Sequence, residues 1–368
     1  MKVEIEKKSL AAALSTVGRA VLGKPSMPIL GTVRLVVVDG QLQLTCTNLD
    51  LGLLTVVKCL DGSIPGGVCV DCRKLTQIVS AMPMPRVTLA TKGSRLQITS
   101  GSSRFELYTL SVDEFPPVAD APTDMEVLYK APQAELLTRL EAVDCAMSND
   151  ETRFILNGVY LDIKEKTTKT VATDGRRMNV HSLDKGSGSA RGIIVPAFTV
   201  SALCALLGDE GNVAMYATER KLVFEIDSAD GPIFLSSKIV EGSYPNYGQV
   251  TKNLDHPSIT LKSDMFVEAL KRVSLACGEK SASVTMRVSG KTITLLARDS
   301  DLGECEEQID LEQPAPAESR VAFNPRFLIE SIRSVQAETF SIGIKDDVSP
   351  IVVRGNNVLS VVMPVRIS

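Results

Sequence analysis

The stretch Ile29–Asp50 (ILGTVRLVVVDGQLQLTCTNLD) predicts two apolar strands that are joined by a turn and end in a short acidic motif. The same pattern recurs at Ile155–Asp174 (ILNGVYLDIKEKTTKTVATD) and at Val284–Asp299 (VTMRVSGKTITLLARD). The aspartates that end the three stretches recur with a period of about 124 residues. A unit that is written three times at a nearly constant period predicts three similar domains in series.

Helices are expected on both sides of each strand pair. An apolar stripe at helical spacing precedes the first pair, at Leu10, Leu14, Val17 and Val21. A second helix is expected after each pair, over Arg73–Met82, Ala197–Leu207 and Asn324–Val335. Further strands fill each unit without the strict alternation of strand and helix that a parallel sheet needs. The fold class is therefore predicted to be α+β, with three repeated domains that each pack two helices on antiparallel sheets.

The domain joins are expected near Asp113–Asp124, which is rich in proline and acidic residues, and near Thr251–Pro257. These positions predict domains over residues 1–124, 125–252 and 253–368.

The composition is typical of a soluble globular protein. Of the 368 residues, 44% are hydrophobic and 23% are charged. The amino-terminal MKVEIEKKSL alternates apolar and charged residues like a strand, and no apolar run reaches the roughly 18 residues that span a bilayer. A cytoplasmic location without membrane association is expected. The net charge of −4 excludes a globally basic nucleic-acid binder but leaves room for local basic faces.

Patterns that indicate catalysis or a cofactor are absent from the sequence. It contains no nucleophile elbow, no zinc-protease helix motif and no phosphate-binding loop. Cys69 and Cys72 form a lone C-x-x-C without the second pair that a structural zinc site needs, so buried thiols are the better interpretation. His181 is interpreted as a surface side chain. No catalytic residue, no metal and no cofactor is predicted.

The recurring aspartates Asp50, Asp174 and Asp299 have two interpretations. They lie at equivalent places in separate units, as residues that hold turns do, or they form a three-metal acidic site. The equivalent placement favours turns.

Two segments stand out as candidate interaction elements. Thr173–Met178 (TDGRRM) places a glycine and two arginines at a tight turn. It is either a solvated hairpin or a recognition loop, in which Arg177 offers a planar fork of donors. Val361–Ser368 (VVMPVRIS) is an apolar tail that is either a closing strand or the lining of an exposed apolar groove.

Basic residues recur on or beside the expected helices, and this recurrence suggests a helical surface that suits phosphates. They are Lys7, Lys8, Arg19, Lys24, Arg73, Lys74, Arg139, Lys271, Arg272, Arg326 and Arg333.

Several motifs, in order and over the whole chain, resemble the β subunit of bacterial DNA polymerase III, the sliding clamp. They are KPSMPILG (Lys24–Gly31), RFILNG (Arg153–Gly158), VATDGRRM (Val171–Met178), YPNY (Tyr244–Tyr247) and VVMPVRI (Val361–Ile367). The resemblance implies a noncatalytic processivity factor, in which two subunits assemble head to tail into a ring around duplex DNA. Its helices would face the phosphates without reading the bases.

The resemblance also implies a pocket for short linear motifs. Its partners would be the catalytic subunit of the polymerase, the clamp loader, other polymerases and repair proteins. By matched motif, the pocket residues are Leu156, Thr173, Gly175, Arg176, Arg177, Met178, Pro245, Val250, Val361, Val362, Met363, Pro364, Val365 and Arg366. Gln249, Pro350 and the extra Ser368 depart from the better-known members.

The same resemblance assigns DNA contacts and a dimer contact. The DNA-binding positions are Lys24, Arg73, Lys74 and Arg153. At the dimer contact, Arg95 and Arg104 of the first domain would meet Glu304, Glu306 and Glu307 of the third, with Phe105 and Leu275 as apolar anchors.

Two other classes of protein are compatible with the chain at this stage. One is a monomeric peptide-binding scaffold of the same fold that never encircles DNA. The other is a hydrolase or nuclease, against which the missing acid–base constellation counts.

Overall fold

A computed structural model describes residues 1–21, 23, 25, 27–118, 125, 127–186, 190–278 and 282–366. Lys24, which the sequence assigns to DNA, and Ser368 lie outside the described residues. In these ranges, no helix is both long and apolar enough to cross a membrane.

The chain forms two compact units. One contains Met1–Leu137 and Ser201–Ile239, and the other contains Thr138–Val200 and Val240–Ser368. The middle repeat therefore contributes strands to both units.

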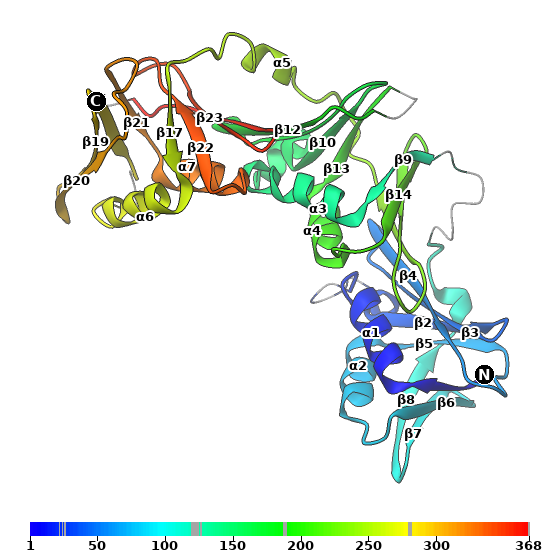
Figure 1. The fold of residues 1–368 in the computed structure, drawn as a ribbon. Helices are drawn as coiled ribbons and strands as arrows, with labels where there is room; N and C mark the ends of the chain where they lie inside the picture. Colours follow the sequence, from blue (N-terminus) through cyan, green and yellow to red (C-terminus); the bar gives the residue numbers. More distant parts are fainter. Residues whose placement is uncertain are drawn as a thin grey trace. The chain divides into compact units, whose positions relative to one another are not determined.

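The first unit is built on a twelve-stranded antiparallel sheet (Figure 1). Its strands lie in the order β1 (Lys2–Glu6), β6 (Arg86–Lys92), β7 (Arg95–Ser100), β8 (Ser103–Leu110), β5 (Gly66–Asp71), β2 (Thr32–Val38), β3 (Gln41–Thr47), β4 (Leu51–Lys58), β16 (Ile233–Lys238), β15 (Lys221–Ile226), β14 (Asn212–Ala217) and β9 (Val127–Pro132). The pairing of β4 with β16 joins the first repeat to the middle one.

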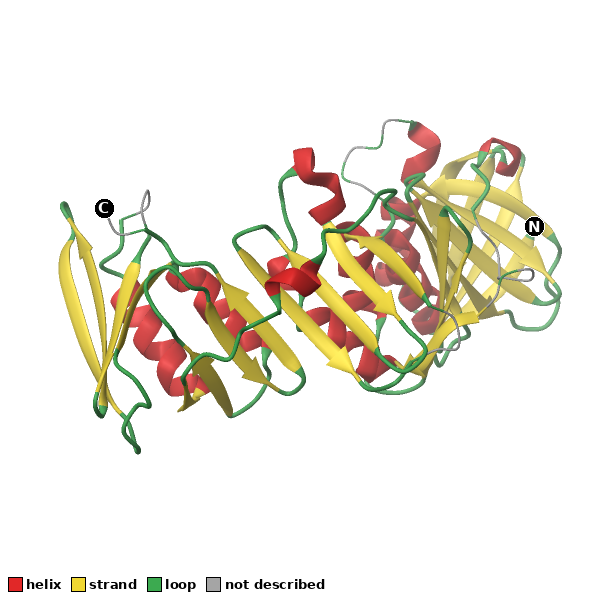
Figure 2. Ribbon diagram, turned by 90° about the horizontal axis from the view of Figure 1, so that it is seen from above, coloured by secondary structure: helices red, strands yellow, loops and turns green. Residues whose placement is uncertain are grey.

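The second unit contains an eight-stranded sheet and a four-stranded sheet (Figure 2). The larger sheet has the order β13 (Arg191–Pro196), β10 (Gly158–Ile163), β11 (Thr168–Thr173), β12 (Arg177–Leu183), β24 (Val358–Val362), β23 (Ile351–Gly355), β22 (Thr339–Gly343) and β17 (Ser258–Lys262). The smaller has the order β20 (Gly303–Asp310), β19 (Thr292–Asp299), β18 (Val284–Ser289) and β21 (Ser319–Phe323). All neighbours are antiparallel, as predicted.

Each repeat carries the two expected helices. They are α1 (Lys7–Gly18) and α2 (Cys72–Ala81), α3 (Gln133–Glu141) and α4 (Ala197–Leu206), and α6 (Ser263–Ser274) and α7 (Pro325–Ser334). The stripe of α1 is buried, because Leu10, Leu14 and Val17 pack it against β3 and β4. Asn324 caps α7, since its Oδ1 accepts a hydrogen bond from the Arg326 amide at 3.0 Å. A short helix, α5 (Tyr247–Val250), lies outside this scheme.

The acidic turns share one hydrogen-bond pattern. Oδ1 of Asp174 accepts from the amides two and three positions later, both at 2.9 Å, and Oδ1 of Asp299 does the same at 2.9 and 3.1 Å. The prediction that these aspartates hold turns is confirmed for both. For Asp50 it is wrong, because Asn48 makes the equivalent bonds at 3.0 and 2.8 Å. Asp50 instead pairs with Lys238 at 2.8 Å.

Two side chains that the sequence placed on the surface are buried. Arg139 is only 1% exposed, and its Nε and Nη2 donate to Thr170 Oγ1 at 3.1 and 2.9 Å. It therefore contributes nothing to a basic surface. His181 is also buried, because β12 has neighbours on both of its faces. Both predictions failed because a local pattern does not reveal which faces of an element are covered.

Candidate interaction site

A single strand pairing brings the TDGRRM loop and the carboxyl-terminal tail together. β12 follows the loop and pairs with β24, with Arg177 opposite Val362 and Met178 opposite Val361. Beyond the end of β24, the amide of Met363 donates to the carbonyl of Arg176 at 2.9 Å. The two segments that the sequence singled out separately are therefore adjacent.

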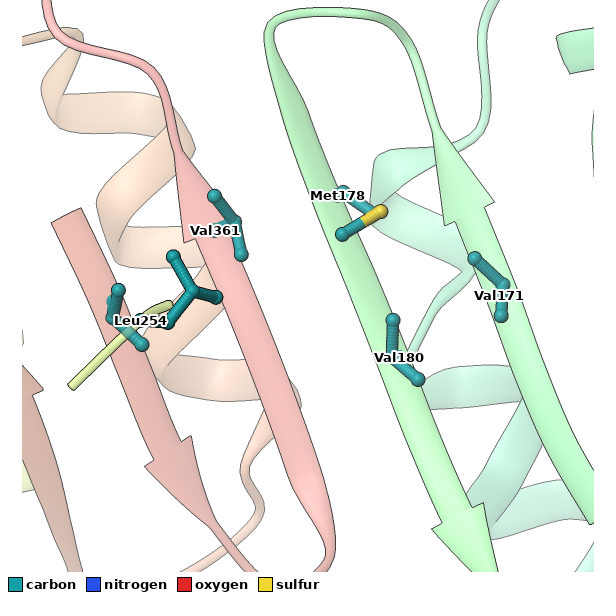
Figure 3. Packing of buried hydrophobic residues seen from close by; sticks show 6 residues of the cluster. Val171, Met178, Val180, Leu254 and Val361 are labelled. Carbon is teal, nitrogen blue, oxygen red and sulfur yellow. The ribbon is translucent and has the colours of Figure 1, made fainter. Parts of the chain in front are cut away.

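β12 is covered on both faces. On one face, Met178 and Val180 pack with Val171, Leu254 and Val361 in an apolar cluster (Figure 3). On the other face, the side-chain amide of Asn179 donates to the carbonyl of Ala142 at 2.9 Å and to Ser334 Oγ on α7 at 3.0 Å. Side chains alternate between the two faces of β12, so that one face is turned toward α7 and the other toward the segment that contains α5. Figure 1 shows α7 and α5 on opposite sides of this sheet.

Three tyrosines build the wall that lies over the apolar cluster. The rings of Tyr160 and Tyr244 stack at 4.7 Å with an interplanar angle of 4°. Tyr247 meets the ring of Tyr160 edge-on, and its hydroxyl donates to Asp162 Oδ2 at 2.5 Å. Burial and this carboxylate both raise the pKa of Tyr247, so its hydroxyl remains a donor at neutral pH. These contacts hold the segment Tyr244–Tyr247 against the sheet.

Between this wall and β12 lies a pocket of about 230 Å³. Of the residues that the sequence assigned to a pocket, ten line it: Leu156, Thr173, Gly175, Arg176, Arg177, Met178, Pro245, Val250, Val361 and Met363. The sequence missed Tyr244, Asn246 and Tyr247, which also line it. The signal in the sequence is the YPNY motif, in which these three residues directly flank or follow the assigned Pro245.

Four assigned residues do not line the pocket. Val362 is fully buried and follows Val361, so its side chain belongs to the opposite face of β24. Pro364, Val365 and Arg366 lie past the end of β24, where the amide of Val365 donates to the carbonyl of Ala322 on β21 at 2.8 Å. The tail is therefore both a closing strand and, at Val361 and Met363, a pocket lining.

The rim of the pocket is a tight turn. Gly175 has a φ of +84°, in the left-handed region that favours glycine. A β-carbon at this position would lie 3.2 Å from Arg153 Nη1, so Arg153 sits beside the pocket rim. Thr173 closes the turn, because its hydroxyl donates to the carbonyl of Arg177 at 2.7 Å.

The expectation that Arg177 offers its donors to a ligand is corrected. Its guanidinium is 7% exposed, and it donates to Asp174 Oδ2 at 3.2 Å and to Glu330 of α7. It also lies over the ring of Phe327, at 4.5 Å from the centroid. Arg177 therefore ties the turn to α7, and the exposed arginine at the rim is Arg176.

The bonds to Glu330 outweigh the effect of its burial. Burial raises the pKa of this carboxyl. Hydrogen bonds from Arg326 and Arg177 lower the pKa by more than burial raises it, so the pKa lies below its usual value. Glu330 is therefore charged at neutral pH and compensates the buried guanidinium.

The described residues that were assigned to DNA lie on different elements. Arg73 and Lys74 are exposed in the first turn of α2. Arg153 is exposed beside Gly175, with Asp150 at 3.7 Å. Several other basic residues pair with carboxylates, including Lys271 with Glu268 and Arg272 with Glu307, both at 2.5 Å.

The residues assigned to a dimer contact lie on the strands β7, β8 and β20 and at one helix end. Arg95 and Arg104 share Glu106, at 3.1 and 2.6 Å, and Phe105 is exposed on β8. On β20, Glu304 and Glu307 pair with Arg298 and Arg272, and Glu306 accepts from the side-chain Nε2 of Gln308. Leu275, just past the end of α6, is 81% exposed.

Among the described residues, no cluster of three or more histidine, cysteine or acidic side chains is arranged to hold a metal. Cys69 and Cys72 are buried thiols, as interpreted from the sequence.

Comparison with known proteins accounts for this architecture. Three sequence families, described as the N-terminal, central and C-terminal domains of the DNA polymerase III beta subunit, match residues 1–119, 130–246 and 253–366. The chain is 31% identical over 377 residues to a beta sliding clamp of Vibrio cholerae and 28% identical over 373 residues to that of Escherichia coli (strain K12). Both alignments cover all of each chain.

Solved structures agree. The chain superposes on the DNA polymerase III subunit beta of Pseudomonas aeruginosa with a TM-score of 0.93 at 27% identity. It superposes on a sliding clamp of Bartonella birtlesii bound to griselimycin with a TM-score of 0.92 at 27% identity. Each comparison covers the whole of both chains. The chain belongs to the DNA polymerase III beta subunit family, the beta sliding clamps, and is a noncatalytic processivity factor of that polymerase.

Proposed function

We propose that two copies of the chain form a head-to-tail ring around duplex DNA, and that the pocket beside β12 receives short linear motifs of partner proteins. These partners are the polymerase III catalytic subunit, the clamp loader, other polymerases and repair proteins. The observation that carries the proposal is the apolar pocket at the pairing of β12 with β24, with Met178 and Val361 at its floor and Met363 at its edge.

The chemistry of the pocket suits an extended peptide. Apolar side chains of the peptide would be buried against Leu156, Met178 and Val361, and exposed Val250 and Met363 offer further apolar surface at the mouth. Exposed Arg176 supplies a charge at the rim. Sliding clamps from two bacteria have been solved with griselimycin bound, which supports a ligand-binding role for this family.

Two unpaired strand edges of opposite charge support the dimer. β8 pairs with β7 along its length but with β5 only at Thr109 and Leu110. β20 is the outer strand of the four-stranded sheet. Arg104 on β8 and Arg95 on the neighbouring strand β7 share the carboxylate of Glu106, whereas three glutamates stand on β20. An antiparallel pairing between copies would therefore satisfy both backbone edges and bring opposite charges together.

Topology rather than tight binding is proposed to retain the DNA. Lys8, Arg19 and Lys74 make no ion pair within the part of the chain that the structure describes, and Arg73 is exposed on α2. The carboxylates paired with Lys271, Arg272 and Arg326 limit the number of phosphate contacts. Sequence-independent contacts of this kind position a duplex without reading it.

Domain boundaries at residues 124 and 252 and a cytoplasmic location complete the proposal. The three family matches support the boundaries. They cover residues 1–119, 130–246 and 253–366, so that each proposed boundary falls between two matches. A subunit of a bacterial replicative polymerase works where the chromosome lies, which supports the location.

The test compares circular and linear DNA. Protein loaded by a clamp loader onto nicked circular DNA should stay bound through gel filtration in moderate salt and be released when the circle is cut. Loss of the protein from uncut circles at the same salt would show that binding is electrostatic and would overturn the ring. Sedimentation at micromolar concentration tests the monomeric scaffold directly, since a monomer there would favour that alternative.

A further inference from the structure

We propose that the junction of β4 with β16 is a second ligand groove, related to the pocket by the internal repeat, and that it takes an acidic peptide. Its volume is about 210 Å³, close to that of the pocket. The inference does not rest on the role proposed for the pocket beside β12.

The two junctions are equivalent in their backbone contacts. The hydroxyl of Thr47 donates to the carbonyl of Leu51 at 2.9 Å, as that of Thr173 does to Arg177 at 2.7 Å. The amide of Lys238 donates to the carbonyl of Asp50 at 3.1 Å, the counterpart of the bond from Met363 to Arg176. Gly52 and Ser236 are register partners, as Met178 and Val361 are.

The covering segments also correspond. Pro116, Pro117 and Val118 line the first groove as Tyr244–Tyr247 (YPNY) lines the pocket. Val118 approaches the floor closely, because a β-carbon on Gly52 would lie 2.5 Å from its Cγ1. The groove therefore has the same construction as the pocket, with a wall of prolines in place of tyrosines.

The lining differs in charge, and this difference selects the ligand. Where the pocket has apolar Val361 and Met363, the groove has Ser236 and Lys238. Lys221 and Lys238 are directly opposite each other on β15 and β16, and both line the groove. Like charges in that position destabilise a sheet, and the carboxylate of Asp50, 2.8 Å from Lys238, compensates only one of them.

An additional carboxylate from a ligand would balance the second lysine. Exposed Leu49 at the rim offers an apolar contact to the rest of an extended chain.

The chain contains no tryptophan, so a single introduced one reports on a chosen site. Leu49→Trp reports on the groove, and Val250→Trp reports on the pocket. The two replaced side chains are nearly equally exposed, Leu49 to 47% and Val250 to 45%. Leu49 already has a φ of +79°, so the replacement adds no new kind of backbone strain. The ligand is the blocked hexapeptide Gly-Ala-Glu-Ala-Glu-Gly, and its control carries Gln in place of both Glu.

Saturable quenching or enhancement is expected for Leu49→Trp with the acidic peptide, and none for Val250→Trp over the same range. The Gln peptide, or the added change Lys221→Gln, should weaken binding about fivefold, the upper limit for one exposed ion pair. Lys221→Gln removes a like-charge contact, so the melting temperature should not fall. Equal responses to the two peptides, equal responses at the two reporters, or displacement of the peptide by duplex DNA at equal charge would each overturn the proposal.

Discussion

The guanidinium of Arg177, at the start of β12, donates to the carboxylate of Glu330 in the middle of α7. This bond joins the middle repeat to the third, directly beneath the turn that forms the rim of the pocket. Because Arg177 also donates to Asp174 at 3.2 Å, one side chain connects the turn, the strand and the helix. The stability of the site therefore depends on an ion pair between a residue of the pocket lining and a helix that does not line the pocket.

Replacing Arg177 by Met should destabilise the second unit by about 2 to 3 kcal/mol, since it leaves Glu330 and Asp174 without a buried partner. Hydrogen exchange of the amides of β12 and α7 measures the effect locally. Arg326→Met is the matched control, because Arg326 bonds the same carboxylate at 2.9 Å but is 77% exposed. That change should cost less than about 0.5 kcal/mol. Equal effects of the two substitutions would contradict the assignment.

Acid should weaken the same contact. The pKa of Glu330 is lower in the folded chain than in the unfolded one, so the unfolded state binds the proton more tightly. The stabilisation is complete above the usual glutamate range and is lost as the pH falls through the folded-state pKa. The difference in unfolding free energy between the native chain and Glu330→Gln should therefore shrink between about pH 6 and about pH 3. A difference that stays constant across this range would refute the prediction.

Met363→Ala should reduce the affinity for a polymerase-tail peptide at least tenfold, about 1.4 kcal/mol, because Met363 supplies exposed apolar surface at the mouth of the pocket. Fluorescence anisotropy of the labelled peptide measures it, and sedimentation should show an unchanged dimer. Met265→Ala is the control, since Met265 on α6 is exposed to 43% against 45% for Met363 and lies outside the pocket. Unchanged affinity in Met363→Ala would remove this residue from the site.

Gly175→Ala should cost about 1 kcal/mol of stability, because φ at this position is +84°. It should also weaken binding of the peptide, because the new methyl group would displace Arg153 at the rim of the pocket. Gly40→Ala separates the two effects. Gly40 has a φ of +73° in a hairpin where a β-carbon meets nothing within 4 Å. Gly40→Ala should lose similar stability with no change in peptide binding. A parallel loss of peptide binding in both variants would argue against a role for the Gly175 turn.

Charge reversal tests the dimer contact. Arg104→Glu should weaken the dimer about tenfold or more by placing a further carboxylate opposite β20, and combining it with Glu306→Arg should restore part of the affinity. Analytical ultracentrifugation over a dilution series gives the constants. Arg86→Glu, on the same sheet but away from the edge of β8, should leave the dimer unchanged. No recovery in the double variant would place the contact elsewhere.

The local elements of the fold were predictable because their signals are local. The stripe of α1 and the turn held by Asp174 each depend on residues within a few positions, and each forms as expected. Asp50 was misassigned as the residue that holds the turn of the first repeat, because a local signal does not separate two neighbouring turn formers. Asn48 and Asp50 both suit turns by composition, and only the bonds of Asn48 distinguish them.

By itself, the sequence determined the threefold repeat, the α+β class and the loop and tail from which the pocket is made, since each is written in contiguous residues. Only the tertiary structure decided that Val361 lines the pocket while Val362 does not, that Arg177 is bound to Glu330, and that Arg139 is buried. Arg139 is buried where it bonds Thr170 on β11, and the other two facts follow from the register between β12 and β24 and from the packing of α7 against β24. Both join segments far apart in the chain, and a one-residue shift in that register would exchange the two faces.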